Sequence, residues 1–335
     1  MAADPGGLAP WLGLVLVATR ASATQPYFPG LVEYLRRARP RALYSATPHM
    51  NIEAEHALKL AKTPTRLIVS EHNTLVPDHP LARGLNKWYL PRLLRRAYRS
   101  ADTVVAVSRG VAEDVSRRTG MPLSAITLIY NPVVTPMLAR GAAEALSHPW
   151  FEADAPPVIL GAGRLGQAKD FPTLIRAFAR VRQKRPARLM ILGEAKGTKK
   201  TAKRQGRLMA LAREAGVAAD VELTGFVQNP FKYMARAAVF ALSSRYEGLG
   251  NVLIEAMACG CPVVASRIPS IIEYGGEAIN SIDVNEKSSI SNAIIRLSND
   301  NVLRERMRRA GIEKAREYDN DSMSRRICEA YRRMS

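Results

Sequence analysis

Short apolar runs rich in β-branched residues alternate with longer amphipathic stretches along most of this chain. Such runs are typical of buried parallel strands, and apolar positions three and four apart are typical of helices that pack on one side. The alternation predicts an α/β fold in which crossover helices join parallel strands. The expected strands are 42–45, 66–70, 103–107, 126–129, 158–161, 188–192, 221–224, 239–242 and 262–265, and the expected helices are 31–39, 51–60, 88–98, 111–118, 171–183, 207–214 and 251–258.

A segment rich in proline and alanine, 131–157, interrupts this alternation and predicts a hinge between two halves. We expect an N-terminal Rossmann-like domain over 1–150, a second one over 151–315, and a helical tail over 316–335 that returns to the first domain. Two consecutive doubly wound units favour two domains that face each other across a cleft, with ligands at the carboxyl ends of the strands.

Composition narrows the range of partners. The 335 residues are 47% hydrophobic and 24% charged, which excludes wholesale disorder. Lys and Arg number 49 against 30 Asp and Glu, a net charge of +19 that attracts nucleic acid, anionic membranes or phosphate-rich small molecules.

Three cysteines are too few for a disulfide framework and favour a reducing compartment. The apolar stretch 8–18 is about half the length of a membrane span, so we expect a cytoplasmic protein.

The segment 243–266, SSRYEGLGNVLIEAMACGCPVVAS, carries the most specific chemistry. A strand ends, a loop follows with Glu247 and two glycines, Gly248 and Gly250, and a helix then begins. Helix amides and glycine backbone can accept a diphosphate, and two acids can hold sugar hydroxyls: Glu247 those of a transferred sugar, Glu255 those of a ribose. On spacing alone, a solvated helix face and a simple glycine turn are an equally good interpretation.

This segment resembles the E-x7-E signature of the retaining glycosyltransferase family 4, which runs here from Glu247 to Glu255. The resemblance continues through the whole run EGLGNVLIEAMACGCPVV, which contains both acids. It implies a GT-B fold and a nucleotide-sugar donor. The implied donor-binding residues around the helix start are Gly248, Leu249, Gly250 and Asn251.

Two further segments of the second half look like parts of the same family. GAGRLGQAKD, 161–170, is similar to its donor-phosphate segment, which implies that Arg164 and Lys169 bind the diphosphate. Fixed cations would stabilise the negative charge left on the leaving group; the alternative is two ordinary surface cations. The turn 225–227 resembles the backbone that receives the nucleobase, at Gly225, Phe226 and Val227. With no Asp-x-Asp dyad in the expected place, we predict neither a metal nor a cofactor beyond the nucleotide-sugar co-substrate.

The first half resembles the family more thinly, at 70–73, 101–108 and 129–132. The resemblance implies that His72 lies near the donor sugar and acceptor, although a lone histidine is more often structural. Ser108, Arg109 and Asn131 are further candidates for the cleft. Family members usually open with a strand and a glycine-rich turn, and because none precedes Tyr34 we expect a shortened N-terminal domain.

Two basic segments leave other interpretations open. The segment 87–99 holds five cations and no acid, which suits either a helix resting on anionic lipid or a solvated helix that packs its leucines on the sheet. The segment 196–207 is expected to be a mobile solvated loop.

The leading hypothesis is a retaining hexosyltransferase that moves a sugar from a UDP- or GDP-sugar to a glycan or a lipid-linked acceptor. The rival hypothesis is an inactive nucleotide-sugar-binding or scaffold protein with a truncated N-terminus. Binding of nucleic acid is not expected, because no recognition motif accompanies the charge. We expect a location in the cytoplasm, with peripheral contact to anionic lipid on the inner face of the membrane.

Overall fold

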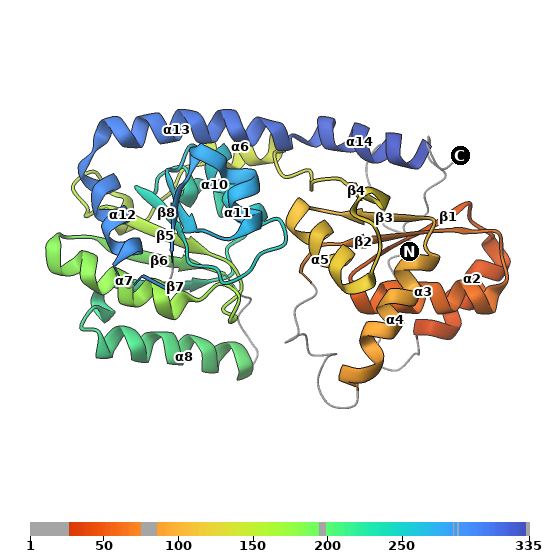
Figure 1. Cartoon of the computed structure of the whole chain (residues 1–335). Coiled ribbons are helices and arrows are strands. Elements are labelled where there is room, and N and C mark those ends of the chain that lie inside the picture. Colours follow the sequence, from red (N-terminus) through yellow and green to blue (C-terminus); the bar gives the residue numbers. More distant parts are fainter. Residues whose placement is uncertain (1–26, 75–85, 194–198, 284, 287, 333–335) are drawn as a thin grey trace. The chain divides into compact units, whose positions relative to one another are not determined.

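The computed structural model describes residues 27–74, 86–193, 199–283, 285–286 and 288–332. The chain divides into two compact units, each with one parallel sheet (Figure 1). The first unit extends to Ile129 and also takes in the end of the last helix from Ala330, and the second unit is Tyr130–Glu329. The predicted parallel α/β architecture in two domains is therefore confirmed.

The first unit contains a four-stranded parallel sheet in the order β1-β2-β3-β4. Because each strand lies beside the next one in the chain, right-handed crossovers place α3, α4 and α5 on the same face of this sheet. The helix that precedes β1 packs on α3 through Leu31 and Leu35. The elements are α2 (Tyr27–Ala38), β1 (Ala42–Ala46), α3 (Pro48–Ala61), β2 (Arg66–Glu71), α4 (Asn86–Ser100), β3 (Thr103–Ala106), α5 (Arg109–Thr119), η2 (Leu123–Ala125) and β4 (Ile126–Leu128).

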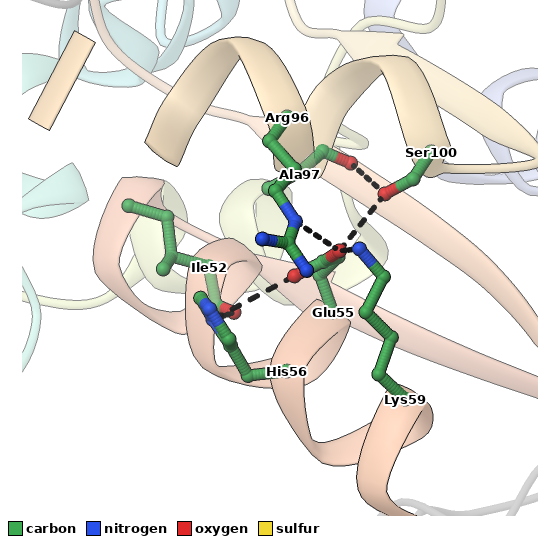
Figure 2. A network of polar contacts seen from close by, with 7 residues as sticks. All are labelled: Ile52, Glu55, His56, Lys59, Arg96, Ala97 and Ser100. Atoms are coloured by element: carbon green, nitrogen blue, oxygen red, sulfur yellow. Dashed lines mark hydrogen bonds and ion pairs between the residues drawn. The ribbon is translucent and has the colours of Figure 1, made fainter. Parts of the chain in front are cut away.

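Glu55 joins α3 to α4 (Figure 2). Its side chain is only 3% exposed, and its carboxylate accepts a hydrogen bond from Arg96 Nε at 3.3 Å and another from Ser100 Oγ at 3.5 Å, both on α4. Lys59, one turn along α3, forms an ion pair with the same carboxylate. Since a carboxylate this buried needs its partners, the cluster fixes the position of the basic helix α4 on α3.

The basic helix α4 confirms the prediction of a helix over 88–98. Leu94 and Tyr98 are buried, so the helix does pack an apolar side into the unit. The arginines lie on its exposed side. These exposed residues are Arg92, Arg95, Arg96 and Arg99. The apolar packing and an accessible basic face occur together on one helix.

The second unit contains a six-stranded parallel sheet in the order β10-β9-β8-β5-β6-β7, with helices on both sides (Figure 1). The main core lies between the sheet and α7, α8 and α12, where Phe171, Leu174 and Phe178 are fully buried. The elements are α6 (Pro136–Ala143), η3 (Pro149–Phe151), β5 (Val158–Ala162), α7 (Phe171–Lys184), β6 (Arg188–Leu192), α8 (Lys199–Glu214), η4 (Ala218–Asp220), β7 (Val221–Gly225), α9 (Phe231–Met234), β8 (Val239–Leu242), α10 (Asn251–Ala258), β9 (Val263–Ser266), α11 (Pro269–Gly275), η5 (Gly276–Ala278), β10 (Asn280–Ile282), α12 (Ser289–Asn299), α13 (Asn301–Ala315), η6 (Arg316–Tyr318) and α14 (Asn320–Arg332).

The segment expected to be a hinge belongs to the second unit. The amides of Val133 and Val134 donate to the carbonyl of Tyr318 at 3.1 and 3.0 Å, and the Arg188 guanidinium lies 5.3 Å from the ring centre of Trp150. These contacts explain why the units divide at Ile129 and not near residue 150.

One expectation about an irregular segment differs from the structure. The segment 196–207 is helical from Lys199 onward, so the expected loop is wrong there; its lysines, alanine and arginine favour helix, and Thr201 and Leu208 are buried. The segment 273–285, which lacks a regular pattern, supplies the edge strand β10. The apolar stretch 8–18 lies outside the described residues. Within the described ranges, no helix is both long and apolar enough to cross a membrane.

Candidate functional site

Hydrogen bonds tie together the loops that follow β5 and β8, two adjacent strands of the second unit. Ser243 Oγ donates to the carbonyl oxygens of Lys169 and Asp170, both at 3.0 Å. Arg245 Nε lies 2.9 Å from Asp170 Oδ2. The strand order thus brings two distant parts of the chain together at the carboxyl edge of the sheet, where Rossmann-like folds bind ligands.

Lys169 and Glu247 form an ion pair between these loops. Lys169 Nζ lies 2.7 Å from Glu247 Oε1, and Ser244 Oγ donates to the same oxygen at 2.5 Å. The two side chains are 14% and 11% exposed, so the pair is shielded from water but still reachable. The structure therefore brings Lys169 and Glu247 together, and their roles in binding the donor stay a prediction.

Glu255 belongs to the same electrostatic cluster. Burial raises the pKa of Glu255 above its ordinary value, and the positive charge of Lys169 opposes that rise. Glu255 lies on α10 and is half-buried, one turn past the beginning of the helix. One lysine therefore acts on both acids of the E-x7-E segment.

Backbone geometry at Gly163 makes room for Lys169. Gly163 has φ +139°, and a Cβ built on it would lie 2.6 Å from Lys169 Cε. No L-residue fits there without moving the lysine stem. This glycine therefore lets the lysine fold back across its own loop.

The loop before α10 ends in Gly250, in the left-handed region at φ +67°. A Cβ at this position would lie 2.2 Å from Tyr274 Oη, on α11. Gly248 and Leu249 are buried, so the Leu249 side chain points away from solvent, and Asn251 is exposed and accepts from Asn131 Nδ2 at 3.1 Å. No described side chain caps the first amides of α10, which leaves them suited to an anion.

The other predicted residues of the second unit lie on nearby loops. Arg164 is exposed on the loop that carries Lys169, and within the described residues no hydrogen bond or ion pair joins it to Glu247. Gly225 ends β7, two strands from β5, and its carbonyl accepts from Gly193 N at 2.8 Å. Phe226 is 67% exposed and Val227 is half-buried. All of these residues lie at or just beyond the carboxyl ends of strands of one sheet.

His72 lies in the first unit, just after β2. Its Nε2 is 3.1 Å from Ser70 Oγ, and burial lowers its pKa. The neighbouring Glu71 accepts from the amides of His72 and Asn73 and, at 2.5 Å, from Tyr98 Oη. Burial raises the pKa of Glu71 to about 7. The role implied for His72 stays a prediction, and Glu71 is a buried acid that the sequence analysis missed.

Ser108, a cleft candidate from the sequence, has a structural function. It is fully buried before α5 and accepts a hydrogen bond from Val111 N at 3.2 Å, which caps that helix. Arg109, its neighbour, lies 3.3 Å from Glu113 on the helix surface.

Several residues that shape the site carry no spacing signal in the sequence. Ser270 Oγ donates to the carbonyl of Glu247 at 3.1 Å, and Tyr274 packs behind Gly250 with its hydroxyl buried and no hydrogen-bond partner among the described residues. Both belong to α11, which the sequence pattern did not predict. Of the residues that hold these loops together, only Ser243 and Ser244 stand out in the sequence, because they end an apolar run that predicts a strand.

The described residues contain no group of three or more His, Cys, Asp or Glu arranged to hold a metal ion. Whether the reaction needs a metal is a separate matter, and the expectation that it needs none stays a prediction.

Comparison with known proteins gives the family. Residues 143–314 match Glycosyl transferases group 1, and residues 10–135 match Glycosyltransferase Family 4. The chain is 30% identical over 264 residues to the N-acetylgalactosamine-N,N'-diacetylbacillosaminyl-diphospho-undecaprenol 4-alpha-N-acetylgalactosaminyltransferase of Campylobacter jejuni, covering 78% of this chain and 68% of that one. It is 32% identical over 218 residues to the lipopolysaccharide core biosynthesis glycosyltransferase LpsE of Rhizobium meliloti, covering 64% and 59%.

Solved structures agree on the fold. Anabaena Alr3699/HepE in complex with UDP and glucose superposes with a TM-score of 0.74 at 20% identity, over 90% of this chain and 80% of that one. Sucrose-phosphate synthase from Thermosynechococcus elongatus gives a TM-score of 0.77 at 20% identity, over 92% and 78%. The sequence matches and the shared architecture place this chain in glycosyltransferase family 4, as an enzyme of the hexosyltransferase type with the GT-B fold.

Proposed function

We propose that this enzyme transfers a hexose-type sugar from a nucleotide diphosphate donor, with retention of anomeric configuration. The observation that carries the proposal is the Lys169–Glu247 pair beside the uncapped start of α10. A cation, helix-start amides without a side-chain cap and a hydroxyl-binding acid lie together at the carboxyl edge of one sheet, which is the set of groups a sugar diphosphate requires.

The diphosphate would bind between Lys169 and the first amides of α10. Lys169 Nζ would leave Glu247 Oε1 for a phosphate oxygen, and Arg164, exposed on the same loop, would supply a second cation. When the glycosyl–phosphate bond breaks, negative charge develops on the leaving diphosphate. Fixed cations and helix amides stabilise this charge more in the transition state than in the ground state, so they raise the rate.

The rest of the donor would follow the same edge of the sheet. Glu247, once released by Lys169, would accept hydroxyls of the transferred sugar, and Glu255 would accept the ribose hydroxyls. The turn of Gly225, Phe226 and Val227 would receive the nucleobase, where Phe226 presents an exposed ring. The Anabaena structure of the same fold was solved with UDP and glucose, which supports a donor of this class.

The acceptor is proposed from the relatives and from charge. The Campylobacter jejuni relative is named for a diphospho-undecaprenol substrate, and the Rhizobium meliloti relative for lipopolysaccharide core synthesis. We therefore propose a lipid-linked or glycan acceptor, reached at the cytoplasmic face of a membrane. The exposed arginines of α4 would hold the protein on anionic lipid, at about 1 kcal/mol per well-placed cation.

Membrane contact is tested with vesicles. Full-length protein should float with phosphatidylglycerol vesicles and not with neutral phosphatidylcholine vesicles, and Arg95→Gln with Arg99→Gln should reduce the bound fraction. A matched loss of two charges, Arg308→Gln with Arg309→Gln on α13, is the control. Equal losses in both variants would contradict a specific role for α4.

The activity is tested by donor hydrolysis and transfer. Purified enzyme is given UDP- and GDP-hexoses with EDTA present, first alone and then with a lipid-diphosphate-linked saccharide. We expect sugar release and transfer with retention, unaffected by the chelator. Nucleotide binding without any release, with or without acceptor, would instead identify an inactive nucleotide-sugar-binding protein. Nucleic acid should not bind at physiological salt.

A further inference from the structure

An open pocket of about 330 Å³ lies at the β10 edge of the six-stranded sheet. Three arginines from three different elements line it: Arg267 after β9, Arg296 on α12 and Arg306 on α13. Asn280 and Ser281 of the edge strand add polar atoms. Strand β10 is the edge strand of the sheet, and β9 and β8 lie between it and β5, whose loop holds Lys169.

Acidic residues do not balance the arginines in the described lining of this pocket. Glu277 is its one acidic lining residue, against three arginines. Among the described residues, no hydrogen bond or ion pair engages the guanidinium of Arg267, Arg296 or Arg306.

The neighbouring arginines of α13 differ in this respect. Arg309 Nε lies 2.8 Å from Glu305 Oε1, and Arg308 Nη1 lies 3.7 Å from the same oxygen. On α13, Arg308 and Arg309, which do not line the pocket, are therefore paired, whereas Arg306, which does line it, has no partner among the described residues.

We propose that this pocket binds a phosphate or diphosphate group of a ligand other than the sugar donor. Guanidinium groups present planar pairs of N–H donors that match phosphate oxygens, and three of them in one pocket repel each other unless an anion lies between them. The hydroxyl of Ser281 and the amide of Asn280 can complete the hydrogen bonding of such a group. This site goes beyond the proposed transfer reaction, which needs none of these residues.

Inorganic pyrophosphate is the probe, titrated by calorimetry into full-length protein carrying Arg164→Ala and Lys169→Ala so that the donor site cannot take it up. We expect this background to bind one equivalent. Adding Arg296→Gln with Arg306→Gln should weaken pyrophosphate binding at least about tenfold. The control, Arg308→Gln with Arg309→Gln, removes the same charge from paired arginines and should change the affinity by no more than about twofold. No binding by the background, or equal weakening by both pairs, would overturn the proposal.

Two further variants keep the test independent of folding. Arg267→Gln, on a different element, should weaken pyrophosphate binding in the same direction, and Glu277→Gln should strengthen it because it removes the one acid of the pocket. Unchanged binding in both variants would count against the pocket as the site.

The phosphate could come from a soluble metabolite or from a lipid headgroup, and vesicles separate these sources. If the headgroup of phosphatidylglycerol occupies the pocket, the Arg296→Gln, Arg306→Gln protein floats less with such vesicles than the Arg308→Gln, Arg309→Gln control. If the ligand is soluble, flotation is equal and only pyrophosphate binding falls. Either result supports a phosphate site; no difference in either measurement refutes it.

Discussion

Lys169 Nζ and Glu247 Oε1 lie 2.7 Å apart although 78 positions separate them in the sequence. Both side chains are largely buried, and Ser244 donates to the same carboxylate oxygen. In the absence of donor the acid balances the lysine charge. A bound diphosphate would therefore compete with Glu247 for Lys169, and the released carboxylate would become available to the sugar.

Lys169→Ala should lower kcat by roughly 10²- to 10³-fold, because it removes a fixed cation from the developing charge of the leaving diphosphate. Initial rates of sugar release from the preferred donor provide the measurement. Lys314→Ala is the matched control, since Lys314 Nζ also lies 2.7 Å from a glutamate, Glu317, but on the surface of α13 and η6. Equal kcat in both variants would remove Lys169 from the mechanism.

Glu255→Ala should weaken nucleotide binding by about 10- to 100-fold, the range expected when one charge-assisted hydrogen bond of about 1.5–3 kcal/mol is lost. Calorimetry with UDP and then GDP measures the effect. Glu305→Ala, an acid exposed on α13, is the control. Unchanged affinity in Glu255→Ala would contradict its assignment to the ribose.

Gly250→Ala should lower the free energy of unfolding by about 1–3 kcal/mol, since an added Cβ meets both a left-handed backbone and the hydroxyl of Tyr274. Urea denaturation gives the value. Gly206→Ala inside α8, where a Cβ meets nothing within 4 Å, should have the opposite sign and stabilise by about 0.5–1 kcal/mol. If both substitutions raise the free energy of unfolding, the close approach of a Cβ to Tyr274 does not destabilise the protein.

Glu71 should make stability fall as the pH rises from about 4.5 to about 7. Burial raises its pKa to about 7 in the folded protein, whereas the unfolded chain ionises near the ordinary value of 4.5. Within this window the folded state binds more protons than the unfolded state, so each rise in pH lowers the free energy of unfolding. The total decrease is about 3 kcal/mol, and it is complete above pH 7.

Glu71→Gln mimics the protonated acid and should remove this dependence. The free energy of unfolding of Glu71→Gln minus that of the natural protein should therefore increase between pH 4.5 and pH 7.5. Urea denaturation of both proteins gives this difference. Groups common to both proteins cancel in that difference. Parallel curves for the two proteins would show that Glu71 does not titrate in this range.

Local sequence patterns are enough to predict the elements and the chemistry of the donor loops. Strands such as β5 and β8 and helices such as α7 and α10 follow from local periodicity, because the spacing of apolar residues is a property of neighbours in the chain. The same local information places Glu247 in a loop and Glu255 one turn into the helix that follows.

Which of these residues meet depends on how the elements pack in three dimensions. The Lys169–Glu247 pair exists because β8 lies beside β5 in the sheet, an order that no local pattern specifies. Tyr274 behind Gly250 and the three arginines beside β10 likewise come from separate elements. Contacts of this kind depend on how whole layers pack, and layer packing is set by buried surface summed over the entire unit and not by any one segment.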